Sequence, residues 1–488
     1  MAGKYDANLI VIGAGSAGLV SAYIGAAVKA KVILIEEAEM GGDCLNRGCV
    51  PSKSLIASAK FLHQIKRAPE YGIKSASADF DFADLMRRVQ SVIDTIAPHD
   101  SAERYASLGV EVIAGSARIT SPHSVSVNGR ELRARAIIVA TGGRPFIPPI
   151  DGIDRVNALT SDTIWGLTAL PARLLVLGGG PIGCELAQCF ARFGSRVTLV
   201  EMLPQIMIRE DREIAAEIAA TLAAEGIDLR VGHRAEKVMV ENGVQTLRCR
   251  RHDEGDGGTD GAPVDIEFDS ILVAVGRAAR LDGFGLRELG IPVSRRRTIE
   301  VNGYLQAGYP SVYACGDVAG PYQFTHAASH QAWYAAVNAL FAPFKKFKVD
   351  YRVMPWATYT DPEIARVGLN ELDAKAAGVQ YEVTRYDLSK LDRALADGHA
   401  RGCVKVLTVP GKDRILGATI IGAHAGDLIA EFVLAMRHGL GLNKILGTIH
   451  AYPTWMEANK FAAGNWKREH APAWALNLLE RFHRWRRR

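Results

Sequence analysis

The sequence predicts an α/β fold with two parallel strand–helix–strand domains, followed by a smaller α+β domain. Two observations carry this prediction. A buried apolar strand, a glycine turn, a helix and a second buried strand follow one another over residues 8–35 and again over 173–200, as in a parallel βαβ unit. From about residue 351 the character changes to strand-like runs and then helices, which is typical of an α+β domain.

Composition and charge exclude several classes of protein. The 488 residues are 48% apolar and 23% charged, so the chain is globular rather than disordered and has room for about three domains. The net charge is +5, and residues 466–488 supply all of it with seven basic and two acidic side chains. The neutral body therefore argues against a nucleic-acid partner. Seven cysteines, an odd number, and no signal-peptide pattern argue against a secreted disulfide framework, and we expect a cytoplasmic protein.

The first glycine turn links the predicted strand 8–12 to the helix 16–29. Its Gly13, Gly15 and Gly18 have the spacing that lets a chain turn, approach a pyrophosphate and pack a helix on a strand. Glu36 ends the next strand, 18 residues after Gly18, where a carboxylate can bind ribose hydroxyls. Together these features predict a dinucleotide site.

The second turn repeats this arrangement. Gly178, Gly180 and Gly183 join the strand 173–177 to the helix 181–193, and Glu201 follows Gly183 by 18 residues. An acid at this place suits a free ribose 2′-hydroxyl and repels a 2′-phosphate, so NADH is favoured over NADPH. Two dinucleotide sites in one chain imply electron transfer between a flavin and a nicotinamide.

Two cysteines, Cys44 and Cys49, lie in the glycine-flanked segment 41–53, ahead of a predicted helix over 52–63 with Pro51 in its first turn. A helix N-terminus stabilises a thiolate. We therefore expect Cys49 to be the persistent thiolate and Cys44 to be the thiol that exchanges with substrate. The alternatives are a structural disulfide, which is unusual in a cytoplasmic chain, and a metal pair, which would need more His or Cys ligands nearby. A redox-active disulfide is favoured, with no metal site.

These motifs, together with ATGGRP at 140–145 and YACGD at 313–317, resemble the class I flavoprotein disulfide reductases, or pyridine nucleotide-disulfide oxidoreductases. The resemblance covers residues 6–470 and is greatest to mercuric-reductase-like and dihydrolipoamide-dehydrogenase-like members. It implies two Rossmann-like domains, which bind FAD and NAD(P), and a homodimer with an active site shared between subunits. The implied divisions are 1–150 and 278–349 (FAD-binding domain), 151–277 (NAD(P)-binding domain), 350–465 (dimerisation domain) and 466–488 (basic tail).

The resemblance also implies roles for particular side chains. Asp317 is expected to hold the flavin ribityl chain, and Lys53 to lie near flavin N5 in a pair with Glu185. The expected FAD-binding residues are Gly13, Gly15, Ser16, Gly18, Glu36, Gly42, Lys53, Thr141, Gly142 and Asp317. The expected nicotinamide-nucleotide residues are Gly178, Gly180, Gly183, Glu201 and Gly276.

The C-terminal motif 450–457 departs from the family's usual pattern. Lipoamide- and glutathione-reducing relatives have a histidine directly before the proline, oriented by a glutamate that corresponds to Glu457, but this chain has Tyr452 there. Tyrosine is a poor proton acceptor at neutral pH. His450 could replace the missing base, although a structural role for it is favoured. Tyrosine at this place is similar to mercuric reductases, but the terminal cysteine pair of those enzymes is absent, since no cysteine follows Cys403.

The expected function is therefore NAD(P)H-dependent, FAD-mediated reduction of a small disulfide or a soft metal ion through Cys44 and Cys49. The alternative within the class is a dihydrolipoamide dehydrogenase, whose substrate is a dithiol. An alternative of another class starts from the tail 472–488, which has a helical apolar period and several arginines. That tail could recruit the flavoprotein to a membrane or a partner, although we expect it to be docked on its own domain. The Gly/Asp-rich stretch 252–263 is expected to be an exposed hairpin tip.

Overall fold

The computed structural model describes residues 5–252, 261–342 and 344–488. The chain divides into two compact units. The first is drawn from Met1–His63, Ala78–Leu203 and Gly226–Asp350, and the second from Gln64–Ser77, Pro204–Glu225 and Tyr351–Arg488. Most of the stretch 252–263, expected to be a hairpin tip, lies outside the described residues. No described helix is both long and apolar enough to cross a lipid bilayer.

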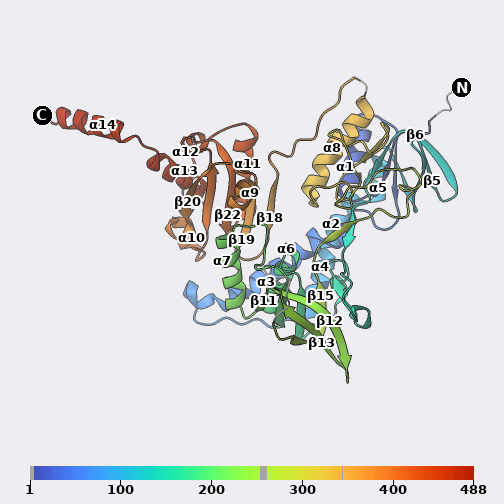
Figure 1. Ribbon diagram of the computed structural model, residues 1–488, viewed down its shortest axis with the longest axis horizontal. Helices are drawn as coiled ribbons and strands as arrows, with labels where there is room; N and C mark the ends of the chain where they lie inside the picture. Colours follow the sequence, from blue (N-terminus) through green and yellow to red (C-terminus); the bar gives the residue numbers. More distant parts are fainter. Residues whose placement is uncertain (1–4, 253–260, 343) are drawn as a thin grey trace. The chain divides into compact units, whose positions relative to one another are not determined.

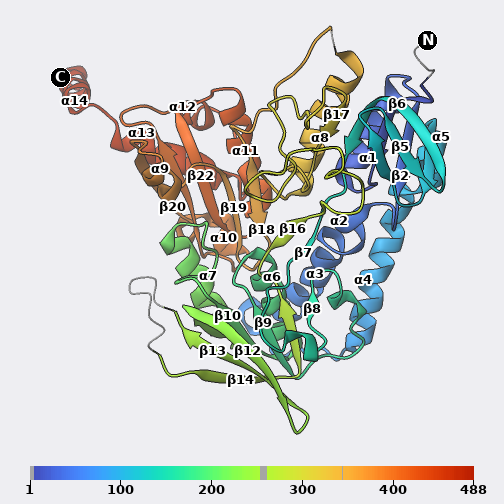
Figure 2. The same cartoon turned by 45° about the vertical axis from the view of Figure 1, so that its right-hand side comes forward.

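The first unit contains the first predicted strand–helix–strand repeat, which is confirmed (Figure 1). The sheet has the order β3-β2-β1-β6-β5-β4, with β17 also paired to β6. The helices α1 (Ser16–Ala27) and α8 (Thr325–Phe341) pack side by side (Figure 2). The strands are β1 (Ala7–Ile12), β2 (Val32–Glu36), β3 (Val110–Ala114), β4 (Arg118–Ser121), β5 (Ser124–Val127), β6 (Arg130–Val139) and β17 (Val312–Ala314).

The second predicted repeat is also confirmed, as an all-parallel sheet of order β11-β10-β9-β15-β8. Its central strands are near-continuous apolar runs because a parallel sheet is covered on both faces. The helix α6 (Pro181–Phe193) leads from β9 to β10. The strands are β8 (Leu159–Thr160), β9 (Arg173–Leu177), β10 (Arg196–Glu201), β11 (Asp228–Val231) and β15 (Ser270–Val273), with an antiparallel sheet of β12 (His233–Glu241), β13 (Val244–Arg251) and β14 (Val264–Phe268) beside them.

Two short antiparallel strands, β7 (Gly143–Pro145) and β16 (Arg277–Ala279), pair with each other. They follow the two buried strands β6 and β15, and a Gly-Arg dipeptide stands where each of them begins, at 143–144 and 276–277. Their pairing explains why the sequence repeats this dipeptide, because each copy forms one passage of the chain between the two parallel sheets.

The second unit is built on an antiparallel sheet of order β18-β19-β22-β21-β20. This agrees with the predicted α+β character of the chain after residue 351, although the unit also takes in the helix α7 (Arg212–Ala224). The remaining elements are β18 (Pro355–Thr358), β19 (Glu363–Gly368), α9 (Glu371–Ala376), β20 (Glu382–Asp387), β21 (Cys403–Thr408), β22 (Ile415–Gly422), α11 (Ala425–Arg437), α12 (Leu442–Leu446) and α13 (Glu457–Glu469).

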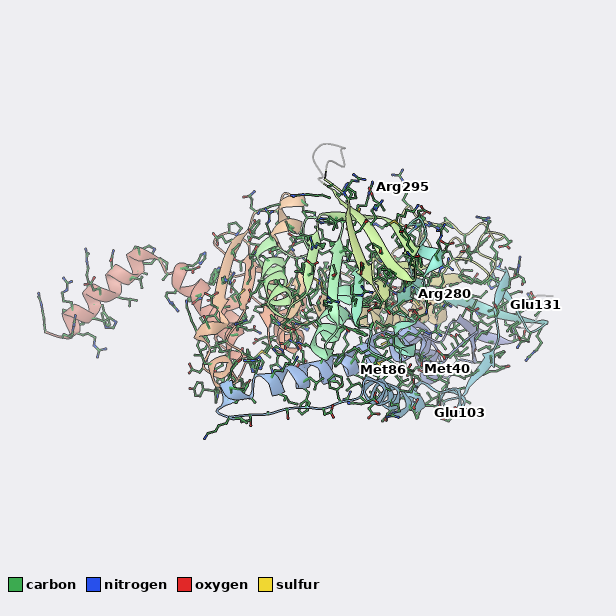
Figure 3. The ribbon with its side chains drawn as sticks, turned by 90° about the horizontal axis from the view of Figure 1, so that it is seen from below. Met40, Met86, Glu103, Glu131, Arg280 and Arg295 are labelled. Carbon is green, nitrogen blue, oxygen red and sulfur yellow. The ribbon has the colours of Figure 1, made fainter. Side chains whose placement is uncertain are left out.

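The tail forms the helix α14 (Ala473–Arg486), so the predicted helical period is confirmed. The expectation that this helix is docked on its own domain is wrong, because none of its residues is buried. The core of the unit instead includes Trp466 of the preceding helix, which is 5% exposed and stacks on His470. Figure 3 shows the side chains of α14 reaching out beyond the sheet and helices of its own unit.

Candidate active site

The two cysteines of the predicted redox pair lie beside each other in the first unit. Cys44 belongs to the short helix α2 (Gly42–Asn46), and Cys49 is the first residue of α3 (Cys49–Lys66). Their side chains share a hydrogen bond, and both are free thiols in this structure. Cys49 is exposed and Cys44 is partly exposed. The arrangement is that of a dithiol that can close to a disulfide.

The pair carries its negative charge on Cys49. The hydrogen bond from Cys44 is the largest influence, and against the opposing effect of burial it lowers the pKa of Cys49 to about 6. Thr325 at the start of α8 also lowers the pKa of Cys49, and its Oγ1 lies 3.3 Å from Cys49 Sγ. The ammonium of Lys53 lowers this pKa further. The same hydrogen bond, together with burial, raises the pKa of Cys44. At neutral pH the reduced pair therefore holds one thiolate and one thiol.

The lowered pKa of Cys49 can be tested by a pH titration of its thiolate. In the reduced protein the ultraviolet absorbance of the Cys49 thiolate, measured as the difference from a Cys49→Ser variant, should fall as the pH decreases through about 6. Cys44→Ala removes the main stabilising donor and should move the midpoint upwards, whereas Cys44→Ser keeps a donor and should move it less. A midpoint that is the same in wild type and Cys44→Ala would contradict the assignment of the thiolate.

Lys53 and Glu185 form an ion pair, with 3.0 Å between Nζ and Oε2. Lys53 lies four residues after Cys49 in α3, so both side chains are on one side of that helix. Glu185 comes from α6 and is 5% exposed. The two sequence-predicted partners are thus brought together although 132 residues separate them, and they place a fixed positive charge near the cysteine pair.

Arg277 is a site residue that the sequence analysis missed. Its guanidinium is bonded to Asp43, the neighbour of Cys44, and donates to the carbonyl oxygen of Gly143 at 3.2 Å. It also lies 3.8 Å from Asp317. Burial raises the pKa of Asp317 to about 6, and Arg277 opposes that rise. The only signal in the sequence is the dipeptide Gly276-Arg277 after a buried strand, which does not indicate the contacts of the arginine.

One cleft of the first unit unites most of the predicted FAD residues. Glu36 accepts hydrogen bonds from the backbone N–H groups of Ala14 (2.5 Å) and Ala38 (2.8 Å), which fixes its carboxylate beside the glycine turn. A Cβ on Gly18 would lie 1.7 Å from the carbonyl oxygen of Gly13, so this glycine is required by packing alone. The cleft is lined by residues that include Gly13, Gly15, Ser16, Glu36, Gly42, Cys44, Thr141, Gly142, Asp317 and Thr325.

The glycine at position 15 is explained by a ligand rather than by the packing that explains Gly18. A Cβ there would meet only Gly42 Cα, at an ordinary 3.8 Å, and its backbone is extended. Protein packing therefore does not require a glycine, whereas a pyrophosphate that approaches the backbone does. The cleft, the helix N-terminus and the fixed carboxylate fit FAD.

The second parallel sheet repeats this geometry. Glu201 accepts hydrogen bonds from the N–H groups of Gly179 (2.7 Å) and Leu203 (2.8 Å). A Cβ on Gly180 would meet no protein atom within 4 Å, although one on Gly183 would lie 2.0 Å from the Gly178 carbonyl oxygen. Gly276 directly precedes β16. The residues at this turn fit a nicotinamide dinucleotide in the same way.

The contrast between the two glycines gives a prediction. Gly180→Ala should leave the free energy of unfolding near that of wild type, because its φ of −75° and ψ of −178° suit any residue. Its KM for the nicotinamide nucleotide should rise about tenfold or more, since the methyl group takes space beside the phosphates. Gly183→Ala is the matched control and should lower protein stability instead. A Gly180→Ala enzyme with an unchanged KM would contradict this account.

His450, Tyr452 and Glu457 lie in the second unit. The ring of His450 is 4% exposed, with Nδ1 3.0 Å from the carbonyl oxygen of Thr448 and Nε2 2.9 Å from Glu431. Tyr452 is 70% exposed and donates its hydroxyl to Asp392, and that carboxylate raises the pKa of the tyrosine. Glu457 is buried and accepts from the backbone N–H of Thr454 at 3.3 Å.

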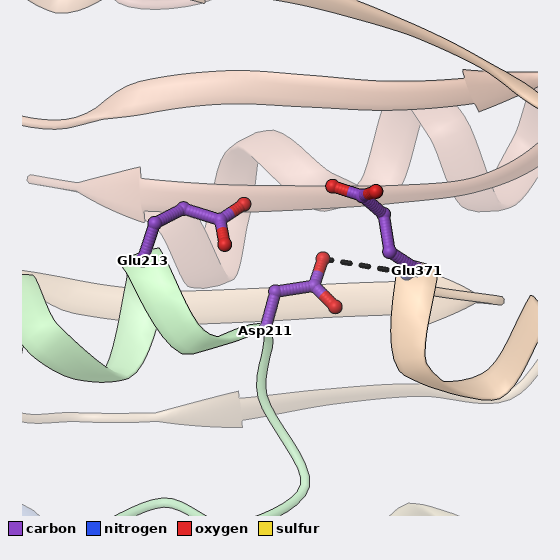
Figure 4. Close-up of side chains that lie close together, drawn as sticks. All are labelled: Asp211, Glu213 and Glu371. Atoms are coloured by element: carbon purple, nitrogen blue, oxygen red, sulfur yellow. Dashed lines mark hydrogen bonds between the residues drawn. The ribbon is translucent and has the colours of Figure 1, made fainter. Parts of the chain in front are cut away.

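Among the described residues, three carboxylates of the second unit lie close enough together to suggest a metal site: Asp211, Glu213 and Glu371 (Figure 4). The ammonium of Lys405 already binds all three of them. It lies 2.8 Å from Asp211 and 2.6 Å from Glu371, and it also bonds Glu213. Burial acts to lower the pKa of Lys405, but the hydrogen bonds to the three carboxylates raise it. The cluster is explained as a buried ion network.

Comparisons with known proteins agree with this geometry. Residues 7–332 match the family described as pyridine nucleotide-disulphide oxidoreductase, and residues 354–463 match the dimerisation domain of that family. A dihydrolipoyl dehydrogenase of Thermus scotoductus is 37% identical over 463 residues, which are 93% of this chain and 96% of the relative. A mercuric reductase of Bacillus cereus is 32% identical over 460 residues, 94% of this chain and 71% of the relative.

A solved structure with a similar fold is the Cu(II) complex of the HOCl-induced flavoprotein disulfide reductase RclA from Escherichia coli. It has a TM-score of 0.82 and 27% sequence identity, and the match covers 95% of this chain and 99% of that chain. The predicted α/β fold with two dinucleotide-binding domains and a dimerisation domain is confirmed, as is the resemblance. The chain belongs to the pyridine nucleotide-disulphide oxidoreductases, a family of enzymes that depend on FAD and NAD(P).

Proposed function

We propose that this enzyme uses NAD(P)H to reduce a soft metal ion or a small disulfide through Cys44 and Cys49. The observation that carries the proposal is the hydrogen-bonded thiol pair, of which Cys44 lines the cleft that fits FAD. Bound FAD would supply the chemistry that turns hydride from a nicotinamide into an electron pair for a disulfide. The glycine turn at 13–18, Glu36, Thr141, Gly142 and Asp317 are the residues proposed to hold it.

The cysteine pair takes up electrons from the flavin and passes them to the substrate. The Cys44–Cys49 disulfide takes up two electrons and one proton, which gives the Cys49 thiolate and the Cys44 thiol. With a disulfide substrate, Cys44 loses its proton, attacks one sulfur and expels the first product thiolate. Cys49 then displaces the second product thiolate as the internal disulfide closes again. With Hg(II), Cys44 loses its proton, both sulfurs bind the ion, and two electrons return to it as the internal disulfide closes; with Cu(II), two ions take one electron each. Lys53, paired with Glu185, is proposed to stabilise the negative charge of the reduced site.

The second unit favours the soft metal ion. Both ring nitrogens of His450 are already engaged, with Thr448 and Glu431, and Tyr452 is a hydrogen-bond donor whose pKa is raised. Neither is arranged as a general base for Cys44. Thiolate capture of a soft cation needs no proton shuttle, and the relatives include a mercuric reductase and a Cu(II)-bound reductase. We propose Hg(II) or Cu(II) as substrates, with His450 in a structural role.

A second candidate is dihydrolipoamide oxidation with NAD as acceptor. The 37% identity to a dihydrolipoyl dehydrogenase favours it. In that case Glu457 would have to act without the histidine that the family usually provides, because Tyr452 stands in its place.

One experiment separates these substrates. The FAD-loaded enzyme is reduced anaerobically with NADH and then mixed separately with lipoamide, glutathione disulfide, Hg(II), Cu(II) and a quinone, while the rate of reoxidation is recorded. We expect the metal ions to reoxidise the wild type fast and a Cys44→Ser variant slowly. Fast turnover of lipoamide would instead support the dihydrolipoamide dehydrogenase. If only the quinone reacted, and equally with both proteins, the enzyme would be a simple diaphorase.

For the reductant we propose NADH. The carboxylate of Glu201 is held at the end of β10 by two backbone N–H groups, where it suits a ribose hydroxyl and repels a 2′-phosphate. The ratio of kcat/KM for NADH over NADPH should therefore exceed one, and Glu201→Ala should reduce that ratio.

We propose a homodimer whose active site is shared between subunits, on the support of the match to the dimerisation domain. The FAD-binding domain would comprise residues 1–150 and 278–349, the NAD(P)-binding domain 151–277, the dimerisation domain 350–465 and the tail 466–488. A cytoplasmic location stays a prediction from the sequence.

A further inference from the structure

The helix α14 exposes an apolar surface that the reductase chemistry does not use. No residue of α14 is buried, and Trp474 and Trp485 are 72% and 70% exposed. The tryptophans of the same unit that belong to its core are 8% exposed at Trp455 and 5% exposed at Trp466. The large aromatic side chains of α14 therefore contribute nothing to the packing of their own unit.

Four apolar side chains of α14 form one stripe along the helix. At ~3.6 residues per turn, Trp474, Leu478, Phe482 and Trp485 fall within about 80° of the helix circumference. Their exposed fractions lie between 44% and 72%. Arg481 and Arg486 lie within about 40° of the edges of this stripe, and Arg484 lies farther round the helix. Leu476 is on the opposite side, so the helix has one aromatic apolar stripe that arginines flank.

The charge of the tail identifies what this face fits. Residues 473–488 contain five arginines and one glutamate, and Glu480 is already paired with Arg484 at 2.8 Å. An aromatic apolar stripe flanked by arginines is the composition of a helix that lies in the plane of a lipid interface. With 14 residues, α14 is ~21 Å long, which is too short to span a bilayer.

We propose that α14 docks on an anionic membrane surface, with its apolar face in the interface and its arginines on the lipid headgroups. A second copy of the chain is a poorer occupant, because the five arginines of each tail would face one another. One helix of this size binds weakly and reversibly. If the chain is the homodimer proposed above, its two tails would act together on one surface.

The experiment uses the FAD-loaded full-length protein and sedimentation with vesicles. We expect it to bind vesicles of phosphatidylcholine mixed with phosphatidylglycerol, and to bind pure phosphatidylcholine vesicles about tenfold less. Raising the salt concentration should weaken the binding by screening the arginines. Deletion of residues 472–488 should abolish vesicle binding and leave NADH-dependent activity unchanged, which separates this inference from the proposed function.

Two variants test the two faces separately. Trp474→Ser with Trp485→Ser should lose binding to both kinds of vesicle, and Arg484→Gln with Arg486→Gln should lose the preference for anionic lipid. Phe344→Ser, which alters an aromatic side chain that is 92% exposed elsewhere in the chain, is the matched control and should bind as wild type. Equal vesicle binding with and without the tail would overturn the proposal. So would tail-dependent self-association, or tail-dependent binding of an acidic protein or RNA, without any vesicle binding.

Discussion

Replacement of Cys44 or Cys49 by serine is expected to lower kcat/KM for the disulfide or metal substrate by at least about a thousandfold, the usual scale for loss of a reacting nucleophile. The hydroxyl of serine can neither form the internal disulfide nor act as a thiolate near neutral pH. The two variants should be about equally defective, because the pair works as a unit. The measurement is steady-state turnover with NADH and the best acceptor found.

Two controls accompany this result. Cys249→Ser changes a buried thiol of another sheet, bonded to the carbonyl oxygen of Val264 at 3.5 Å, and should keep full turnover. All variants should still reduce ferricyanide, since that acceptor does not need the cysteines. If Cys44→Ser kept full activity with the natural acceptor, the cysteine pair would have no part in the reaction.

Lys405→Met is expected to lower the free energy of unfolding by about 3–5 kcal/mol, the usual cost of removing one partner from a buried ion network. Lys405 and Asp211 are 2% and 3% exposed in their side chains. Without the ammonium, Asp211, Glu213 and Glu371 would face one another without the one cation that all three share. The measurement is urea unfolding of the FAD-loaded protein followed by tryptophan fluorescence.

The pH dependence of the lost stability and a variant of the neighbouring Lys375 are the controls for Lys405→Met. At neutral pH Lys405 is fully charged, because its raised pKa keeps the proton on until the pH is well above that of a free lysine. In Lys405→Met the penalty should shrink as the pH falls and the carboxylates take up protons. Lys375→Met removes an ammonium 3.7 Å from Glu371 that is 66% exposed, and should cost less than about 1 kcal/mol. Equal penalties in the two variants would contradict the buried network.

The parts of the site that could be predicted are those in which neighbours in the sequence are also neighbours in space. The glycine turns, Glu36 and Glu201 are specified by the spacing of a single βαβ unit, and the two cysteines are five residues apart. The helix after the cysteines begins at Cys49 rather than Ser52, so Cys49 has the N-terminal position on which its predicted thiolate depends.

The parts that were missed depend on distant contacts. Thr325 reaches Cys49 across 276 residues and Arg277 reaches Asp43 across 234, and neither residue lies in a periodic pattern. The buried network of Lys405 joins residues from three elements, and a lysine within an apolar strand gives no sign of the carboxylates that neutralise it. Amphipathic periodicity predicted that α14 is a helix, but it does not show whether the apolar face packs on the same domain. The expectation that α14 docks on its own domain was wrong.

The central claim is that Cys44 and Cys49 store electrons in addition to those held by FAD. Anaerobic titration of the FAD-loaded enzyme with dithionite tests it directly, with absorbance recorded at each addition. The account predicts that wild type takes up four electrons per FAD, two for the disulfide and two for the flavin, and that Cys44→Ser takes up only two. Uptake of two electrons by both proteins would contradict it.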